Sequence, residues 1–323
     1  MKGEMQQLYG QKQAQKFISR SLAAERMAHA YLFQGPDGVG KQLFARKLAV
    51  VINCKNSNGL QSCGVCSSCR KMSSGSHPDF LSVSPEKGAI KIAQIRDLTK
   101  RLTFAPYEAK TRVVLVEDVH SMGQEAANAL LKTLEEPPEN NILILTADSA
   151  GNVLRTILSR CQTIPFYSLT AEETCRVLRE QDAEIDRQTA LLLARLGEGS
   201  PGKALLLHRK DLISLWESVT ALLADAVCKR DAETGTVLLM AAKLAALKED
   251  LIHFLGLLRL WLRDGLVAFY DGAEASGTQK TRKEWNSQQY FAKLEAIDSA
   301  EKELSRNCNR TLVCEVLLFR LTI

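Results

Sequence analysis

Two patterns of hydrophobic and polar positions alternate along the first half of the chain. Short runs rich in Val, Ile, Leu and Phe are typical of buried strands, and apolar residues at three- and four-residue spacing are typical of amphipathic helices. The strands that the sequence predicts are Ala30–Gln34, Phe80–Ser84, Arg112–Val116, Asn141–Thr146 and Cys161–Pro165. The helices predicted between them cover residues 41–52, 92–104 and 122–135. This β-α-β-α-β order predicts a parallel sheet with crossover helices, an α/β fold.

After Phe166 the strand pattern stops and helical patterns follow. Thr170, followed by two glutamates, predicts the start of a helix, and a second helix is expected around residues 187–196. The last third of the chain is expected to be helical, apart from a polar gap at residues 271–280. The units that we expect are an α/β domain at residues 1–167, a small helical lid at 168–210 and a helical domain at 211–323.

Composition narrows the class of protein but not its function. The 323 residues are 46% hydrophobic and 24% charged, which is typical of an ordinary globular protein rather than a disordered or fibrous one. Lys and Arg outnumber Asp and Glu by 42 to 37, and this net charge of +5 is too small to establish a nucleic-acid contact. Residues 1–30 lack the apolar run of a signal peptide, and charges interrupt the apolar stretch 251–270. We therefore expect a cytoplasmic protein.

The segment GPDGVGKQ lies between a predicted strand and a predicted helix, which is the position of a phosphate-binding loop. Glycines let backbone N–H groups converge on a phosphate, while the lysine and the helix dipole supply positive charge. The residues that would hold the phosphates are Gly35, Gly38, Gly40 and Lys41. Gln42, however, occupies the position of the Ser or Thr whose hydroxyl holds magnesium. The alternative is a glycine-rich turn without a ligand, so nucleotide binding stays open.

Two acids, Glu117 and Asp118, end the predicted third strand. A hydrolysing site needs one acid for the metal ion and one to orient water, usually in the order Asp-Glu. Here the order is reversed, so the Glu117 carboxylate extends a methylene too far and that of Asp118 falls a methylene short. A displacement of about 1 Å can cost roughly a hundredfold in rate. The pair therefore indicates impaired hydrolysis, unless both acids simply face solvent after a core strand.

Nine cysteines in a cytoplasmic chain favour free or metal-bound thiols over disulfides. Four of them have the spacing C-x8-C-x2-C-x2-C, and these are Cys54, Cys63, Cys66 and Cys69. Four thiolates that converge tetrahedrally form a closed, structural zinc site. An iron–sulfur cluster is the alternative ligand, and unligated thiols are a further one. His77 is expected to be a turn residue rather than a ligand, and the other five cysteines are expected to be buried, unreactive thiols.

Two cations, Arg160 and Lys203, have both a structural and a functional interpretation. Arg160 lies between a predicted short helix and the last strand, where a cation stabilises the carboxyl end of a helix. It would alternatively serve as an arginine finger for a nucleotide on a neighbouring subunit. Lys203 begins a helix in GSPGKAL and could contact a γ-phosphate. The residues by themselves favour the structural interpretation for Arg160 and a solvated side chain for Lys203.

Several motifs occur in an order that resembles the AAA+ clamp-loader subunits of bacterial DNA polymerase III. The motifs are AHAYLFQGPDGVGK, SCGVCSSC, SGSHPDF, AANALLKTLEEPP, LSRCQ and GSPGKAL. They span residues 28–205, and NCNRTLVCEVLLFRL near the end resembles the carboxyl-terminal collar of that family. The motor subunits of the family carry GPRGTGKTS-type loops and an Asp-Glu pair. Gln42, Glu117 and Asp118 depart from that pattern and indicate the delta-prime type.

The resemblance implies an AAA+ phosphate-loop domain with a zinc module at residues 54–69, a lid and a collar that assembles a hetero-pentamer. It implies a non-catalytic stator whose partners are the tau/gamma motor subunits and the delta subunit, with the sliding clamp and primer–template DNA contacted through the complex. In that arrangement Arg160 reaches the ATP site of an adjacent motor subunit, so the resemblance favours the arginine finger.

Two other functions stay possible at this stage. The first is an ATP-hydrolysing tau/gamma-like motor subunit, which the retained Lys41 allows. The second is an autonomous zinc-dependent nucleic-acid binder. Only Lys55, Arg70 and Lys71 add positive charge near the cysteines, and no aromatic residue there could stack on a base, so the sequence disfavours this second function.

Overall fold

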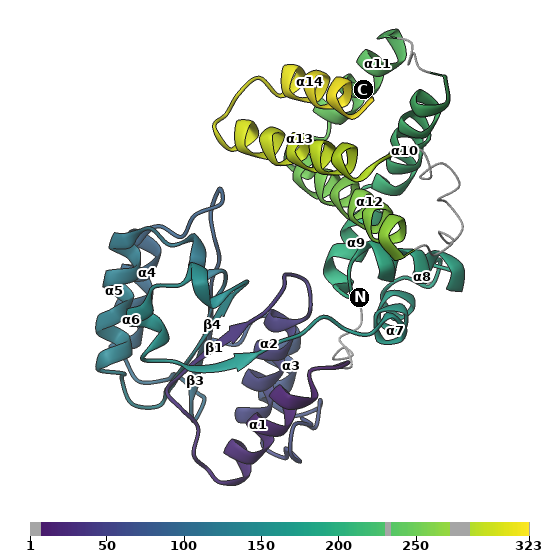
Figure 1. Ribbon diagram of the computed structural model, residues 1–323. Coiled ribbons are helices and arrows are strands. Elements are labelled where there is room, and N and C mark those ends of the chain that lie inside the picture. The colour runs from purple at the N-terminus through teal and green to yellow at the C-terminus, as the bar shows by residue number, and fades with distance from the viewer. Residues whose placement is uncertain (1–7, 230–233, 272–284, 323) are drawn as a thin grey trace. The chain divides into compact units, whose positions relative to one another are not determined.

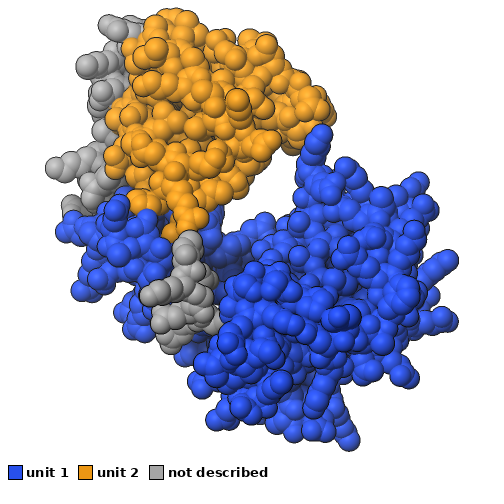
Figure 2. Space-filling view, turned by 180° about the vertical axis from the view of Figure 1, so that it is seen from behind, with its two compact units in different colours: residues 1–204 blue, residues 205–323 orange. Residues whose placement is uncertain are grey.

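The computed structural model describes residues 8–229, 234–271 and 285–322. The chain forms two compact units, residues 1–204 and 205–323 (Figure 2). Residues 272–280 of the predicted polar gap lie outside the described part of the chain. The finer division into three domains stays a prediction.

A five-stranded parallel sheet forms the centre of the first unit, as predicted. Its strands are β1 (Ala30–Gln34), β2 (Phe80–Val83), β3 (Arg112–Val116), β4 (Asn141–Ala147) and β5 (Gln162–Pro165). Their order in the sheet is β2-β3-β4-β1-β5, and every neighbouring pair is parallel. Because all strands run in one direction, their carboxyl ends form one edge of the sheet and their amino ends form the opposite one. We call these the carboxyl edge and the amino edge.

Helices cover both faces of this sheet (Figure 1). One face is covered by α1 (Lys12–Ala23) and α2 (Lys41–Ile52). The other face is covered by α4 (Ile92–Leu102), α5 (Gln124–Glu135) and α6 (Arg155–Leu158). A strand buried on both faces needs apolar side chains at every position, which explains the continuous hydrophobic runs of the sequence.

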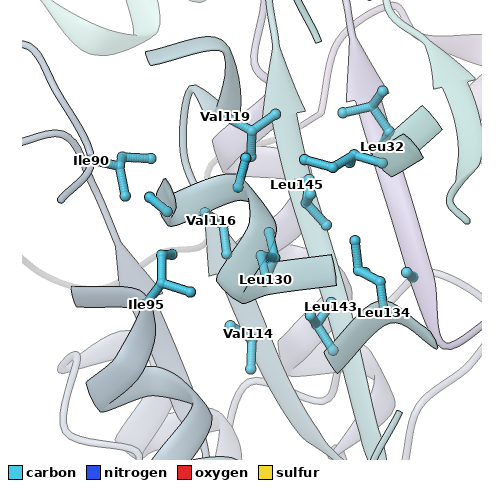
Figure 3. Close-up of a cluster of buried hydrophobic side chains, with 14 of the residues drawn as sticks. Leu32, Ile90, Ile95, Val114, Val116, Val119, Leu130, Leu134, Leu143 and Leu145 are labelled. Atoms are coloured by element: carbon cyan, nitrogen blue, oxygen red, sulfur yellow. The ribbon is translucent and has the colours of Figure 1, made fainter. Parts of the chain in front are cut away.

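The side chains of β3 alternate between two hydrophobic cores. Val113 and Leu115 pack under α1 and α2, while Val114 and Val116 pack under α4 and α5. Figure 3 shows the second of these cores, in which Leu130 of α5 lies over the strand residues. This packing fixes the register of β3 and therefore the position of the two acids that follow it, because a shift by one residue would exchange the faces.

Three helices follow β5: α7 (Ala171–Gln181), α8 (Arg187–Leu196) and α9 (Pro201–Arg209). The predicted start at Thr170 is confirmed as a capping box. The Thr170 hydroxyl accepts the Glu173 N–H at 3.2 Å, and the Glu173 carboxylate accepts the Thr170 N–H at 3.1 Å.

The second unit is helical, as predicted. Its helices are α10 (Leu212–Lys229), α11 (Thr234–Ala245), α12 (Leu251–Asp271), α13 (Ser287–Ser305) and α14 (Arg310–Thr322). The rings of Trp261, Trp285 and Tyr290 pack edge to face in its core, with centroids 5.4–5.7 Å apart. Within the described ranges, none of the helices has the length and apolar character needed to cross a membrane.

Candidate functional site

The phosphate-loop segment connects β1 to α2 at the carboxyl edge of the sheet, where ligands of open α/β sheets bind. Gly35, Gly38 and Gly40 therefore lie in the predicted place. Gly38 has φ of 74°, and a Cβ atom added there would lie 2.4 Å from Oγ of Ser200. Only glycine combines this left-handed backbone with such a close approach.

The ammonium group of Lys41 is buried inside its own loop. It donates hydrogen bonds to the carbonyl oxygens of Gly35 and Pro36, the second at 2.9 Å, and to Oδ1 of Asp37 at 3.1 Å. The Lys41 side chain is 5% exposed. Because an ammonium group has three N–H donors, all of them are occupied by the loop itself. A phosphate would have to compete with these bonds.

Gln42 and Glu117 meet where a loop hydroxyl and a strand acid would hold magnesium. The Gln42 amide Nε2 donates to Oε2 of Glu117 at 3.0 Å, and Arg46 Nη2 lies 3.5 Å from the other carboxylate oxygen. Burial raises the pKa of Glu117, and the positive charge of Arg46 opposes that shift. Magnesium needs oxygen ligands in an octahedral arrangement, but this position presents an amide N–H and a guanidinium. The residues present do not fit a catalytic magnesium ion.

Arg46 was missed by the sequence reasoning. It lies four residues after Gln42, so both side chains extend from the same face of α2. Its guanidinium also lies over the Phe80 ring, 5.4 Å from the centroid. The helical spacing was readable from the sequence, but the partner of Arg46, Glu117, directly follows β3, so the contact depends on the fold of the sheet.

Asp118 forms different contacts from Glu117. Its backbone is left-handed, with φ of 51°, and its N–H donates to the Thr146 hydroxyl of β4 at 3.0 Å. Burial raises the pKa of Asp118, and the nearby charge of Asp37 raises it further. The Asp118 carboxylate therefore lies near Asp37 of the phosphate loop, and its charge also raises the pKa of Glu117.

The segment at the start of α9 packs directly on the phosphate loop. The Ser200 hydroxyl donates to the Asp37 carbonyl at 2.6 Å, and the Gly202 N–H donates to the Gly38 carbonyl at 3.0 Å. Lys203 is thereby brought to the loop, but its ammonium group lies 3.3 Å from the Glu198 carboxylate. The phosphate loop and the start of α9 are thus in direct backbone contact.

Arg160 lies at the amino edge, away from the loop. Its Nη2 lies 2.7 Å from Oε1 of Glu135, and its Nη1 donates to the Thr156 carbonyl at 3.1 Å. The carbonyl contact agrees with a cation at the end of a short helix. The phosphate loop is at the other edge, so the length of a strand separates it from Arg160. The four residues of β5 span roughly 13 Å at about 3.3 Å per residue.

The four predicted metal ligands come together at the amino edge. Their sulfur atoms lie within 4.8 Å of one another, and those of Cys63 and Cys69 are 4.0 Å apart. A tetrahedral zinc ion with Zn–S bonds of about 2.3 Å would place its sulfurs about 3.8 Å apart. The donor set therefore fits a tetrahedral metal ion.

Backbone N–H groups surround these sulfurs. The Cys63 N–H donates to the Cys54 sulfur at 3.2 Å, and the Cys66 N–H donates to the Cys63 sulfur at 3.4 Å. Hydrogen bonds from the backbone of Lys55 and Cys69 lower the pKa of Cys66 to about 6. Burial raises the pKa of Cys69 to about 12, so metal binding would have to displace its proton.

The other cysteines agree only in part with the sequence. Cys314 is buried, whereas Cys161 and Cys175 are partly exposed. Cys308 is exposed because it lies in the turn between α13 and α14, so the expectation of a buried thiol there was wrong. The side chain of Cys228 lies outside the described residues.

A buried ion pair beside the metal centre was also missed. The Asp79 carboxylate accepts the N–H groups of Tyr107, Glu108 and Ala109 at 2.7–2.9 Å and lies 3.4 Å from the Arg112 guanidinium. Burial by itself would raise the pKa of Asp79, but the three N–H donors and Arg112 bring it below its ordinary value. Asp79 precedes β2 and Arg112 begins β3, so only the pairing of these strands brings them together.

Comparison with known proteins agrees with this architecture. The family model described as "DNA polymerase III, delta subunit" matches residues 10–170. The delta' subunit of Bacillus subtilis is 35% identical over 208 residues, which are 64% of this chain and 61% of that protein. The delta' subunit of Escherichia coli is 32% identical over 213 residues, 65% of this chain and 64% of that protein.

The tau subunit of Escherichia coli is 34% identical over 209 residues, 64% of this chain and 32% of that protein. The chain thus spans about a third of the tau subunit and less than two thirds of the delta' subunits.

A crystal structure of a DNA polymerase III gamma subunit-related protein from Thermotoga maritima is 19% identical and has a TM-score of 0.51, covering 95% of this chain and 98% of its own. This likeness confirms the predicted AAA+ fold class. The chain belongs to the family of bacterial DNA polymerase III clamp-loader subunits that includes the delta' subunits.

Proposed function

We propose that the chain is a delta-prime-type stator of the clamp loader, which does not hydrolyse ATP itself. The observation that carries this proposal is the contact between Gln42, Glu117 and Arg46 at the expected magnesium position. Hydrolysis in this fold needs a metal ion that neutralises charge on the phosphates. Here the strand carboxylate is already bonded to an amide and a guanidinium of the same chain.

The phosphate loop gives a second reason for low affinity for nucleotide. Lys41 would have to give up hydrogen bonds to its own loop. Ser200 and Gly202 also donate hydrogen bonds to carbonyl groups of that loop. Ligand binding that breaks existing bonds gains only the difference between the old and new contacts. We propose that this pocket works without ATP, with the loop acting as a packing surface for the helices that follow.

Arg160 is the group that we propose to act in catalysis, on a neighbouring motor subunit. Its distance from the phosphate loop of its own chain supports action in trans. A guanidinium presents a rigid fork of donors that matches a phosphate group. In the isolated chain this fork contacts Glu135, and we propose that a neighbouring nucleotide replaces that carboxylate. An arginine finger can contribute roughly a thousandfold in rate.

The second unit provides surface for assembly with the tau/gamma and delta subunits. Large apolar side chains are exposed on two helices that pack together, α11 and α14. They are Leu238, Leu239, Leu312 and Val316. Exposed apolar groups of this kind are typical of protein interfaces. We propose that these two helices take part in collar assembly, and that the sliding clamp and primer–template DNA are contacted through the complex.

For the metal centre we propose a structural zinc ion. Four sulfur donors close the coordination shell, which leaves no position for a substrate or water. Iron–sulfur binding is the competing assignment, and elemental analysis of the purified protein separates the two. A cytoplasmic location is part of the same proposal, because free thiols persist in a reducing compartment.

The proposal is tested in a reconstituted clamp loader by the change Arg160→Ala. We expect DNA-stimulated ATP hydrolysis to fall roughly a thousandfold, because the motor subunit loses a transition-state contact. Arg155→Ala is the matched control, since Arg155 lies on the same short helix and is exposed. Normal hydrolysis with Arg160→Ala, or equal loss with both variants, would remove Arg160 from this role.

A further inference from the structure

The loop between α4 and β3 combines exposed rings with a buried anchor. Phe104 and Tyr107 are 72% and 85% exposed, although aromatic side chains are usually covered. Beneath them the backbone is bonded to a fully buried ion pair. The Arg112 guanidinium donates to the Phe104 carbonyl at 2.8 Å and to the Ala105 carbonyl at 2.9 Å. Asp79 accepts the backbone N–H groups further along the same loop. The loop is therefore held from inside while its rings face outward.

The metal centre contacts this loop through the short helix α3 (Ser67–Ser73). The ammonium group of Lys71 on α3 forms an ion pair with the Glu108 carboxylate of the loop. Ser68 on the same helix hydrogen-bonds Nε2 of His77 at 3.3 Å, and that ring nitrogen lies 3.7 Å from Glu108. His77 in turn accepts the Asp79 N–H at 3.2 Å. A continuous chain of polar contacts thus joins α3 to the loop anchor.

The geometry of α3 depends on the metal ligands. Cys66 caps its amino end, where the sulfur accepts the Cys69 N–H at 3.5 Å, and Cys69 is buried within its first turn. A helix of seven residues is too short to be stable by its own hydrogen bonds, because helix nucleation is unfavourable. Ligation of its N-cap residue, Cys66, and of Cys69 in its first turn would hold it in place. The positions of Ser68 and Lys71 follow from that ligation.

We propose that the metal centre positions the loop of residues 104–109 through α3. The ion fixes the helix, the helix presents Ser68 and Lys71 to His77 and Glu108, and these contacts hold the loop on its anchor. In this role the centre acts on a surface outside its own coordination shell. The inference rests on the metal site and is independent of whether the phosphate loop hydrolyses ATP.

The test is amide hydrogen exchange of the full chain, measured by mass spectrometry with zinc bound and after zinc chelation. The amides of Tyr107, Glu108 and Ala109 report on the loop because each donates to Asp79. We expect their exchange to become at least tenfold faster after chelation, while exchange in β4 and α5 stays unchanged. Unchanged exchange in the loop, with protection lost only in residues 54–73, would overturn the proposal.

A second experiment keeps the metal bound, in case chelation loosens the whole unit. The double change Ser68→Ala with Lys71→Met removes the two contacts of α3 without touching a cysteine. Its matched control is Ser67→Ala with Arg70→Met, because both of those side chains are exposed on the same helix. With zinc content equal, we expect loop exchange to rise at least threefold in the first variant and to stay at the wild-type rate in the control. Equal rates in the two variants would contradict a positioning role.

Discussion

The two edges of the sheet differ in the exposure of the groups that were predicted to act in nucleotide chemistry. At the carboxyl edge, Lys41 is 5% exposed and the Glu117 carboxylate 13% exposed, and both are bonded within the chain. At the amino edge, Arg160 is 35% exposed, and Phe104 and Tyr107 extend into solvent. The polar groups at the edge that carries catalysis in related folds are thus bonded to one another, while the opposite edge exposes part of its side chains to solvent.

This difference supports the proposal that the chain keeps the nucleotide-binding fold without hydrolysing ATP itself. A buried charge is costly unless it is paired. At the position expected for a magnesium ion, Gln42 and Arg46 are the partners of the Glu117 carboxylate. The amino edge combines a buried charged pair, Asp79 and Arg112, with exposed or partly exposed groups, which are Arg160, Phe104 and Tyr107.

The largest expected effect concerns the shape of the cation at the amino edge. In a reconstituted clamp loader, Arg160→Lys should lower DNA-stimulated ATP hydrolysis by roughly a hundredfold or more, because lysine keeps the charge but lacks the forked donors. Steady-state hydrolysis measures the effect, and Arg155→Lys serves as the control. Full activity with lysine would show that only positive charge matters there.

The buried anchor of the amino edge should be the most sensitive site for stability. Asp79→Asn leaves Arg112 unpaired and gives three N–H groups one acceptor oxygen, so we expect the free energy of unfolding to fall by about 3 kcal/mol. Urea unfolding measures it. Asp97→Asn is the control, because the Asp97 carboxylate is 65% exposed in its pair with Arg101. That change should cost less than about 0.5 kcal/mol.

The same anchor predicts a pH dependence. The pKa of Asp79 is lowered in the folded state, so its contribution is present above the unfolded pKa of about 3.9 and is lost as pH falls through the lower, folded pKa. The stability difference between wild type and Asp79→Asn should therefore shrink below about pH 3.9. A difference that stays constant down to the acid transition would contradict an ionised Asp79.

At the carboxyl edge, Gly38→Ala tests the packing of the phosphate loop. The added methyl group meets Ser200 at 2.4 Å in a left-handed backbone, so we expect a loss of about 3 kcal/mol. Gly88→Ala is the matched control, because Gly88 has φ of 82° with open space around it. That variant should lose only about 1 kcal/mol. Equal losses would mean that the loop does not pack as described.

The smallest effect is the coupling between Gln42 and Glu117. A double-mutant cycle with Gln42→Ala and Glu117→Ala should give an interaction of about 1 kcal/mol, the size of one hydrogen bond to a charged group that is partly exposed. Urea unfolding of the four proteins gives the value. Additive effects of the two changes would indicate that the Gln42–Glu117 hydrogen bond does not stabilise the fold.

The sequence predicted the features that depend on local patterns. The predicted strand boundaries lie within one residue of those in the structure, because buried apolar runs and turns are local signals. The cluster of four cysteines and the Thr170 cap were predicted from residue spacing. The Glu117–Arg46 and Asp79–Arg112 pairs were missed. Each pair joins elements that only the folded sheet brings together, and nothing in the spacing of these residues indicates their contact.

Magnesium-dependent ATP hydrolysis by the purified chain alone distinguishes a stator from a motor subunit. A Lys41→Ala variant, prepared identically, corrects for contaminating ATPases. We expect the wild-type chain to turn over ATP no faster than this variant, because Gln42 and Arg46 are bonded to the Glu117 carboxylate that a metal ion would need. Rapid turnover by the wild-type chain that disappears with Lys41→Ala would contradict it and identify a motor subunit instead.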